Sequence, residues 1–180
     1  RVRVEGRRVT QRVGRKLAVD EISPVGAPEG EAGAITASIV NATGSQAYVW
    51  ILLRFADRPA TPEPVEWFET QALGPPPSFD HYWRVASFNN INLTGSAVYG
   101  WYDLPQNRSY YVYDSDGDGL LDADLGRMRE DAIAVSDADI YFPDFIGMNL
   151  IFNDTIDHCC SWGGGGNLTI DNVTRFWGTT

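Results

Sequence analysis

A run of aspartates near the middle of the chain has the spacing of a calcium-binding loop. Asp114, Asp116 and Asp118 stand at every second position and Gly119 follows, as in the first half of an EF-hand loop. A hard cation needs several carboxylate oxygens that converge on one point, and the sharp turn between them favours glycine. The pattern therefore predicts a calcium ion as cofactor, held by Asp114, Asp116, Asp118, Asp122, Asp124 and the backbone carbonyl of Leu120.

The second half of this loop departs from the EF-hand pattern. The last ligand position, where a bidentate Glu is expected, is Leu125, although Asp124 and Asp131 lie close enough in sequence to substitute for it. From Leu121 onward apolar residues recur at helical spacing, so the loop is expected to lead into a helix that packs on the core. The alternative to a cation site is a solvated Asp/Gly turn, which is common in loops.

Residues that other catalytic sites require are scarce. The two histidines, His81 and His158, do not form the His-Glu-x-x-His motif that a zinc peptidase needs. His81 falls in an aromatic helix pattern, which favours a core or surface histidine. His158 precedes Cys159 and Cys160, a combination with poor geometry for a soft metal. No nucleophile turn, phosphate loop or distinct acid-base pair stands out, so the sequence identifies no catalytic residues.

Charge divides the chain into a basic N-terminal arm and an acidic remainder. Residues 1–16 carry seven basic residues and one acidic residue, whereas residues 17–180 carry seven basic and twenty-three acidic residues. The arm lacks the interleaved aromatic residues of a single-strand binder, and the acidic body repels phosphate, so nucleic acid is not an expected partner. An acidic protein surface, including that of a second copy of this chain, suits the arm better.

Valines alternate with charged residues in the arm, as in an extended strand. Val2 and Val4 share one phase, Gly6 interrupts it, and Val9 and Val13 resume it. Because the apolar face is thin and the opposite face is mainly Arg and Lys, this segment is expected at a sheet edge or exchanged between molecules. Repeated strand donation would produce a homo-oligomer or a fibre. The alternatives are a segment that folds back on its own sheet and a disordered segment.

Six Asn-X-Ser/Thr triplets indicate a secreted glycoprotein with N-linked glycans. The chain opens without Met, as expected of a mature or trimmed form, and no apolar run reaches membrane-spanning length. A disulfide between the neighbours Cys159 and Cys160 would close a strained ring, and the alternatives are free thiols or pairing with another chain. The predicted glycosylation sites are Asn41, Asn92, Asn107, Asn153, Asn167 and Asn172.

The periodicity of the remaining chain predicts an α+β fold. Residues 17–57 are expected to form a β-rich portion that resembles an immunoglobulin-like sandwich, in which Ile35–Val40 and Ala47–Phe55 form a hairpin. Ala47–Phe55 is nearly continuous in apolar residues, which predicts a central strand covered on both faces. In residues 58–180, helices are expected to alternate with strands. The helices are predicted to start near Thr61 and near Ser78, which is a good N-cap. The predicted strands are Ile91–Leu104, Met148–Phe152 and Leu168–Trp177, and Gly163–Gly166 is predicted as a loop.

The order of features from Tyr48 to Thr180 resembles one family, the secreted zinc metallopeptidases of the immune-inhibitor-A type and their gametolysin-like relatives. The similar stretches are ILLRFADRPATP, SFDHYWRVASFNNINLTGSAVYGWYDLP, NRSYYVYDSDGDG, GMNLIFN and CCSWGGGGNLTIDNVTRFWGTT. The resemblance implies a zincin-like mixed sheet with packed helices, whose last stretch is similar to the edge strand that precedes the zinc-binding helix. These residues do not include the histidines of that helix, so the resemblance implies no zinc site within them.

Two functions are consistent with these features. The first is a structural role, as a secreted, calcium-stabilised glycoprotein that self-associates through its arm, up to an extracellular filament. The second is the N-terminal part of a secreted zinc endopeptidase, in which Leu168–Trp177 pairs with an extended substrate and the zinc ligands lie beyond Thr180. The missing His-Glu-x-x-His motif favours the structural role for these residues and leaves enzymatic activity open.

Overall fold

The computed structural model describes residues 2–10, 15–24, 42–157 and 163–180, with side chains from residue 42 onward. The chain divides into two units, Arg1–Val40 and Asn41–Thr180, and each is described by itself. None of the helices in the described ranges combines the length and apolar character needed to cross a bilayer.

The first unit contains an antiparallel pair of strands, β1 (Val2–Thr10) and β2 (Arg15–Pro24). Their register shifts between Glu5 and Gly6, so the interruption predicted at Gly6 is confirmed as a bulge. Val2, Val4 and Val9 therefore lie on a strand that pairs within its own chain, while Val13 lies outside the described residues. β2 continues past residue 16, which the charge pattern predicted as the end of the basic arm, so the hairpin extends beyond the predicted arm.

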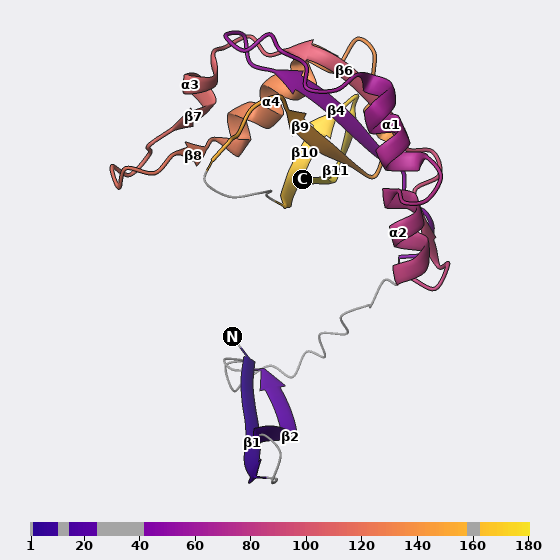
Figure 1. Cartoon of the computed structure of the whole chain (residues 1–180), viewed down its shortest axis with the longest axis vertical. Coiled ribbons are helices and arrows are strands. Elements are labelled where there is room, and N and C mark those ends of the chain that lie inside the picture. The colour runs from indigo at the N-terminus through magenta and orange to yellow at the C-terminus, as the bar shows by residue number, and fades with distance from the viewer. Residues whose placement is uncertain (1, 11–14, 25–41, 158–162) are drawn as a thin grey trace. The chain divides into compact units, whose positions relative to one another are not determined.

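The second unit is built on a five-stranded mixed sheet with the order β10-β11-β9-β4-β6, which confirms the α+β prediction (Figure 1). All neighbours in this sheet are parallel except β10 and β11. The strands are β3 (Gly44–Ser45), β4 (Tyr48–Arg54), β5 (Ile91–Asn92), β6 (Ala97–Asp103), β7 (Val112–Tyr113), β8 (Asp122–Ala123), β9 (Gly147–Phe152), β10 (Gly164–Ile170) and β11 (Val173–Thr179). The helices are α1 (Val65–Leu73), α2 (Phe79–Ala86), α3 (Arg108–Tyr111), α4 (Leu125–Ser136) and the 3-10 helix η1 (Phe142–Asp144).

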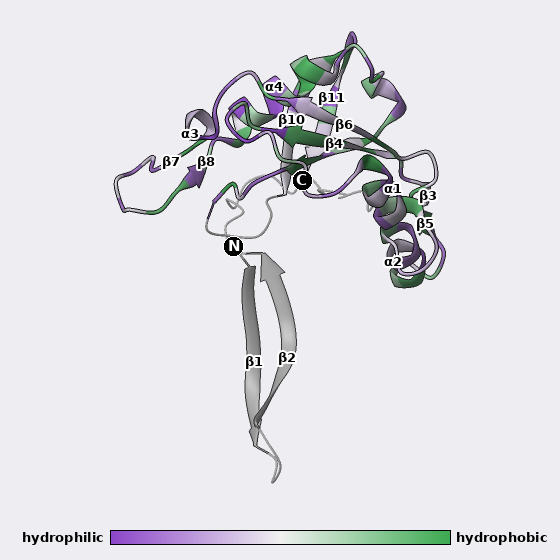
Figure 2. Cartoon of the chain, turned by 45° about the horizontal axis from the view of Figure 1, so that its top comes forward, coloured by the Kyte–Doolittle hydropathy of each residue, from purple (hydrophilic) through white to green (hydrophobic). Residues whose placement is uncertain are grey.

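Strand β4 lies in the interior of this sheet, as its apolar run predicts. Val49 through Leu53 are all buried, and Figure 2 shows the strand green through its middle. β4 pairs in parallel with β6 on one edge and with β9 on the other. Because the strands of a hairpin are antiparallel, neither neighbour forms a hairpin with β4. Ile35–Val40, the other strand of the predicted hairpin, lies outside the described residues. Within the predicted turn, Gly44 and Ser45 pair in parallel with β5 instead.

Alternate residues of β4 pack on opposite faces of the sheet. Val49, Ile51 and Leu53 belong to the main core, which α4 joins through Met128 and Ala132. The even-numbered residues Trp50 and Leu52 join a second, smaller core with Phe68 and Ala72 of α1, on the other side of β4 (Figure 1). Val65 of the same helix packs against this second core, so Val65, Phe68 and Ala72 share one face of α1. This alternation is the two-residue period of a strand that is covered on both faces.

Local caps set the start of the aromatic helix α2. Ser78 is its N-cap, as predicted, and its Oγ accepts a hydrogen bond from the backbone N–H of His81 at 3.2 Å. Asp80 then holds the helix to the following connection, because its carboxylate accepts from Arg84 Nε at 2.7 Å and from the N–H of Leu93 at 2.7 Å. Burial raises the pKa of Asp80, but these hydrogen bonds outweigh it, and the net pKa lies below its usual value.

The end of the chain forms a hairpin rather than the single strand predicted over Leu168–Trp177. Asp171 and Asn172 both have positive φ, 50° and 63°, and turn the chain between β10 and β11. Gly164 to Gly166, predicted as a loop, are part of β10 and pair with the last residues of β11. The prediction was wrong because glycine carries no strand propensity of its own, whereas an available neighbouring strand supplies backbone partners.

Candidate metal centre

The aspartate-rich segment forms the connection between β7 and β8, which extends away from the sheet (Figure 1). The two short strands close it, with Tyr113 opposite Asp122 and Val112 opposite Ala123. Gly119 has φ +87°, a left-handed conformation that only glycine adopts cheaply, as the calcium-loop pattern predicts at that position. The loop is therefore a turn of the expected kind, but strands flank it where an EF-hand has helices.

Three carboxylates converge in this loop. Asp114, Asp116 and Asp122 each place an oxygen within 4.8 Å of the others, close enough to share one cation. Asp114 is also held by the backbone, because its oxygens accept from the N–H of Gly117 at 2.7 Å and of Gly119 at 3.0 Å. The structure thus brings together the first, second and fourth of the predicted aspartates.

Ser115 orients Asp122 within the cluster and was not among the predicted site residues. Its backbone N–H and its hydroxyl both donate to Oδ2 of Asp122, at 3.1 and 2.5 Å. The aspartates drew attention in the sequence because of their charge, whereas Ser115 stands between two of them and gives only a weak turn signal. Its role depends on the β7–β8 pairing, which brings residues 115 and 122 together.

The other predicted ligands point to other partners. Asp118 accepts a hydrogen bond from the N–H of Leu120 at 2.8 Å, and Leu120 itself is exposed. Asp124 is the N-cap of α4, where it accepts from the N–H of Arg127 at 3.1 Å and pairs with the Arg127 guanidinium at 3.2 Å. Asp131 accepts the hydroxyl hydrogen of buried Tyr111 at 2.6 Å. The geometry therefore supports a ligand set that is smaller than the sequence suggested.

The helix after the loop begins later than predicted. It starts at Leu125 rather than Leu121, because Asp122 and Ala123 pair as β8 and Asp124 then caps the helix. Met128 and Ala132 are buried as expected, while Leu125, at the position of the missing bidentate Glu, is 43% exposed. Tyr111 packs under this helix, and its burial, together with the bond to Asp131, raises the pKa of the phenol above its usual value.

The predicted glycosylation sites differ in how their side chains are engaged. Asn107, Asn167 and Asn172 are exposed, and Asn172 lies in the β10–β11 turn. Asn92 is half-buried, and its Oδ1 accepts from Ser45 Oγ and from the N–H of Thr94, each at 3.0 Å. Asn41 lies outside the described residues. Three of the predicted sites thus present an asparagine at the surface of the second unit.

Asn153 is engaged at both ends of its amide. Its Nδ2 donates to the carbonyls of Arg58 and Ala60 at 2.5 and 2.7 Å, and its Oδ1 accepts from the N–H of Phe55 at 3.3 Å. An N-linked glycan replaces one hydrogen of Nδ2, so at most one of these two donated bonds could remain. Asn153 is therefore a structural residue that joins β9 to the segment after β4.

The remaining candidate ligands form no site in the described part of the chain. His81 is exposed on α2, and its backbone N–H donates a hydrogen bond to the N-cap residue Ser78. His158, Cys159 and Cys160 lie outside the described residues, and so does the pairing of the two thiols.

Compared with models of known protein families and with curated proteins, the chain matches none of them.

Proposed function

We propose that the chain is a calcium-binding module of a secreted glycoprotein, with a structural rather than a catalytic role. The observation that carries this proposal is the convergence of Asp114, Asp116 and Asp122 within 4.8 Å in a loop closed by β7 and β8. Calcium prefers such an all-oxygen set, and the cation offsets the repulsion of three carboxylates held close together. The bound ion then stabilises the connection from which Asp124 starts α4.

Calcium is expected to raise the melting temperature, and EDTA is expected to reverse the rise. A ligand that binds only the folded state at about a hundred times its Kd adds about 2.7 kcal/mol, which corresponds to about 5–10 °C for a chain of this size. Calorimetry measures the shift for the wild type and for Asp114→Asn, which is expected to lose it. Asp137→Asn, an equal change of charge at the C-cap of α4, serves as the control and keeps the shift. Identical melting with and without calcium rejects the proposal.

Self-association through the N-terminal hairpin is the second part of this proposal. In the described residues, β1 and β2 form a sheet of only two strands, so each leaves one edge without a strand partner. A two-stranded hairpin is marginally stable by itself, and pairing with the edge of another sheet stabilises it. The basic charge of residues 1–16 and the acidic charge of residues 17–180 favour pairing with another copy of the chain.

Removal of residues 1–24 is expected to convert an associating protein into a monomer. The deletion takes away both strands that offer free edges, and half of the basic residues of the chain. Sedimentation velocity over a range of protein and salt concentrations measures the effect, because charge-assisted association weakens as salt rises. If the shortened protein associates as strongly as the intact one, the assembly surface lies elsewhere.

A zincin-like upstream domain of a zinc endopeptidase is the second candidate. It is favoured by the parallel order β9-β4-β6 with an antiparallel edge strand, β10, next to β11. In this reading the finer fold assignment, a sandwich-like start followed by a zincin-like sheet, also applies, and an extended substrate pairs with β10. A His-Glu-x-x-His motif encoded soon after Thr180 would establish this candidate, whereas casein cleavage by these residues alone would contradict both candidates.

A further inference from the structure

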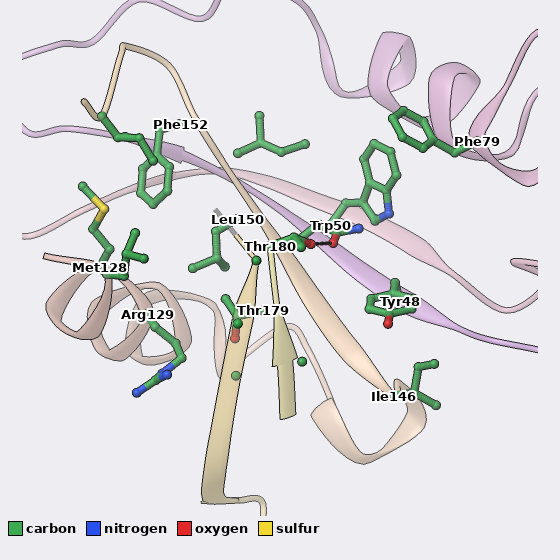
Figure 3. A pocket seen from close by; sticks show the side chains of 18 of the residues that line it. Tyr48, Trp50, Phe79, Met128, Arg129, Ile146, Leu150, Phe152, Thr179 and Thr180 are labelled. Atoms are coloured by element: carbon green, nitrogen blue, oxygen red, sulfur yellow. Dashed lines mark hydrogen bonds between the residues drawn. The ribbon is translucent and has the colours of Figure 1, made fainter. Parts of the chain in front are cut away.

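The second unit contains a large groove that is separate from the aspartate cluster. It has a volume of about 1300 Å³ and is bounded by β4, β9, α4 and the C-terminal hairpin. Figure 3 shows Met128 and Arg129 of α4 on one side and Tyr48, Trp50 and Phe79 on the other, with Leu150 between them. Most of these side chains are apolar, and such a concave apolar surface with few polar groups is the usual form of a small-molecule site.

Arg129 is the charged residue of this groove that lacks a partner. Among the described residues no carboxylate forms an ion pair with it, and its Nε is buried without a hydrogen-bond partner. This is unusual in the second unit, because every other arginine there is engaged. Arg54, Arg58, Arg84, Arg108 and Arg127 each pair with an aspartate, and Arg175 donates to the Phe145 carbonyl and lies 3.9 Å above the ring of Trp177.

A second polar group without a partner lies on the same side of the groove. Thr179 lines it, and its Oγ1 is buried without a hydrogen-bond partner (Figure 3). Asp154, an acidic residue that also lines the groove, already pairs with Arg58 and Arg108. A half-buried guanidinium and a buried hydroxyl that both lack partners are costly to leave unpaired, and a carboxylate accepts hydrogen bonds from both kinds of donor. The charge that complements this groove is therefore negative.

We propose that the groove binds an amphipathic carboxylate, a molecule with a hydrocarbon chain or ring system and one carboxylate group. The carboxylate pairs with Arg129 and accepts the hydroxyl hydrogen of Thr179. The hydrocarbon body lies along the apolar wall that contains Met128, Leu150 and Phe152. This site is independent of the calcium proposal, because none of the three converging aspartates lines the groove.

Decanoate is the probe, and decanol is the uncharged comparison. Isothermal titration calorimetry without added calcium is expected to show decanoate binding about ten- to a hundredfold more tightly than decanol, since the charge-assisted bonds to Arg129 exist only for the carboxylate. Lengthening the chain to dodecanoate is expected to tighten binding at least about twofold per methylene.

Arg129→Gln is expected to reduce decanoate affinity to that of decanol and to leave decanol unchanged. Arg129→Lys keeps the charge and is expected to retain part of the preference. Arg127→Gln is the matched control, two residues earlier on α4 and engaged with Asp124 outside the groove, and it leaves both affinities unchanged. Equal affinity for decanoate and decanol in the wild type, or an unchanged decanoate affinity in a folded Arg129→Gln variant, overturns the proposal.

Discussion

Trp177→Ala is expected to lower the free energy of unfolding by about 3–5 kcal/mol. Trp177 on β11 is fully buried, and its ring meets Phe142 edge to face with centroids 6.3 Å apart. Its Nε1 also donates to the carbonyl of Leu168 on β10 at 3.2 Å. Removal of the indole leaves a cavity between the sheet and η1 and a carbonyl without its donor, so both the packing loss and the lost hydrogen bond contribute.

The adjacent residue provides the control for this substitution. Phe176 lies on the opposite face of the same strand and is 62% exposed, so Phe176→Ala is expected to cost less than about 1 kcal/mol. Denaturant unfolding of both variants measures the difference in their free energies of unfolding. The comparison requires that this free energy falls with denaturant concentration at the same slope in both variants. Similar losses for the two variants would show that β11 does not present Trp177 to the core.

Gly100→Ala is expected to destabilise the second unit by about 3–5 kcal/mol, through strain and overpacking together. Gly100 has φ +127°, a conformation that residues with a Cβ rarely adopt. A Cβ there would lie 2.5 Å from the carbonyl oxygen of Leu52 and 2.9 Å from its Cβ. Leu52 is fully buried in β4, so the sheet itself has to shift to accept a methyl group.

Gly126→Ala is the matched control for this change. Gly126 lies in the first turn of α4, and an added Cβ meets only Asp124 Oδ1, at 3.4 Å. Because alanine favours the helix over glycine, this variant is expected to be neutral or more stable by up to about 1 kcal/mol. Thermal and denaturant unfolding of both variants give the comparison, and a Gly100→Ala variant as stable as the wild type would contradict the close β4–β6 approach.

The aspartate cluster and the groove are separate sites, and helix α4 runs from one to the other. Asp124 caps α4 beside the aspartate loop, and Arg129 lies on the groove side of the same helix. The two are separable, because Asp114→Asn changes the cation site alone and Arg129→Gln changes the groove alone.

Several features follow from the sequence because neighbouring residues determine them. The apolar run of β4 predicted its place between two strands, and Ser78 predicted the start of α2. The alternation of aspartates before Gly119 predicted a turn that brings Asp114 and Asp116 together. In each case the predictive signal lies in the types and spacing of a few neighbouring residues, even though the strands that pair with β4 are distant in the chain.

The tertiary structure alone decided which of these residues act together. Asp122 joins Asp114 because β7 pairs with β8, whereas Asp124, two residues later, caps a helix. The bonds of Asn153 to the carbonyls of Arg58 and Ala60, and the position of Arg129 in an apolar groove, depend on contacts between segments far apart in the chain. The glycines of β10 become a strand only because β11 pairs with them. Local sequence carries no record of such partners, since each segment gains them only when the chain is folded.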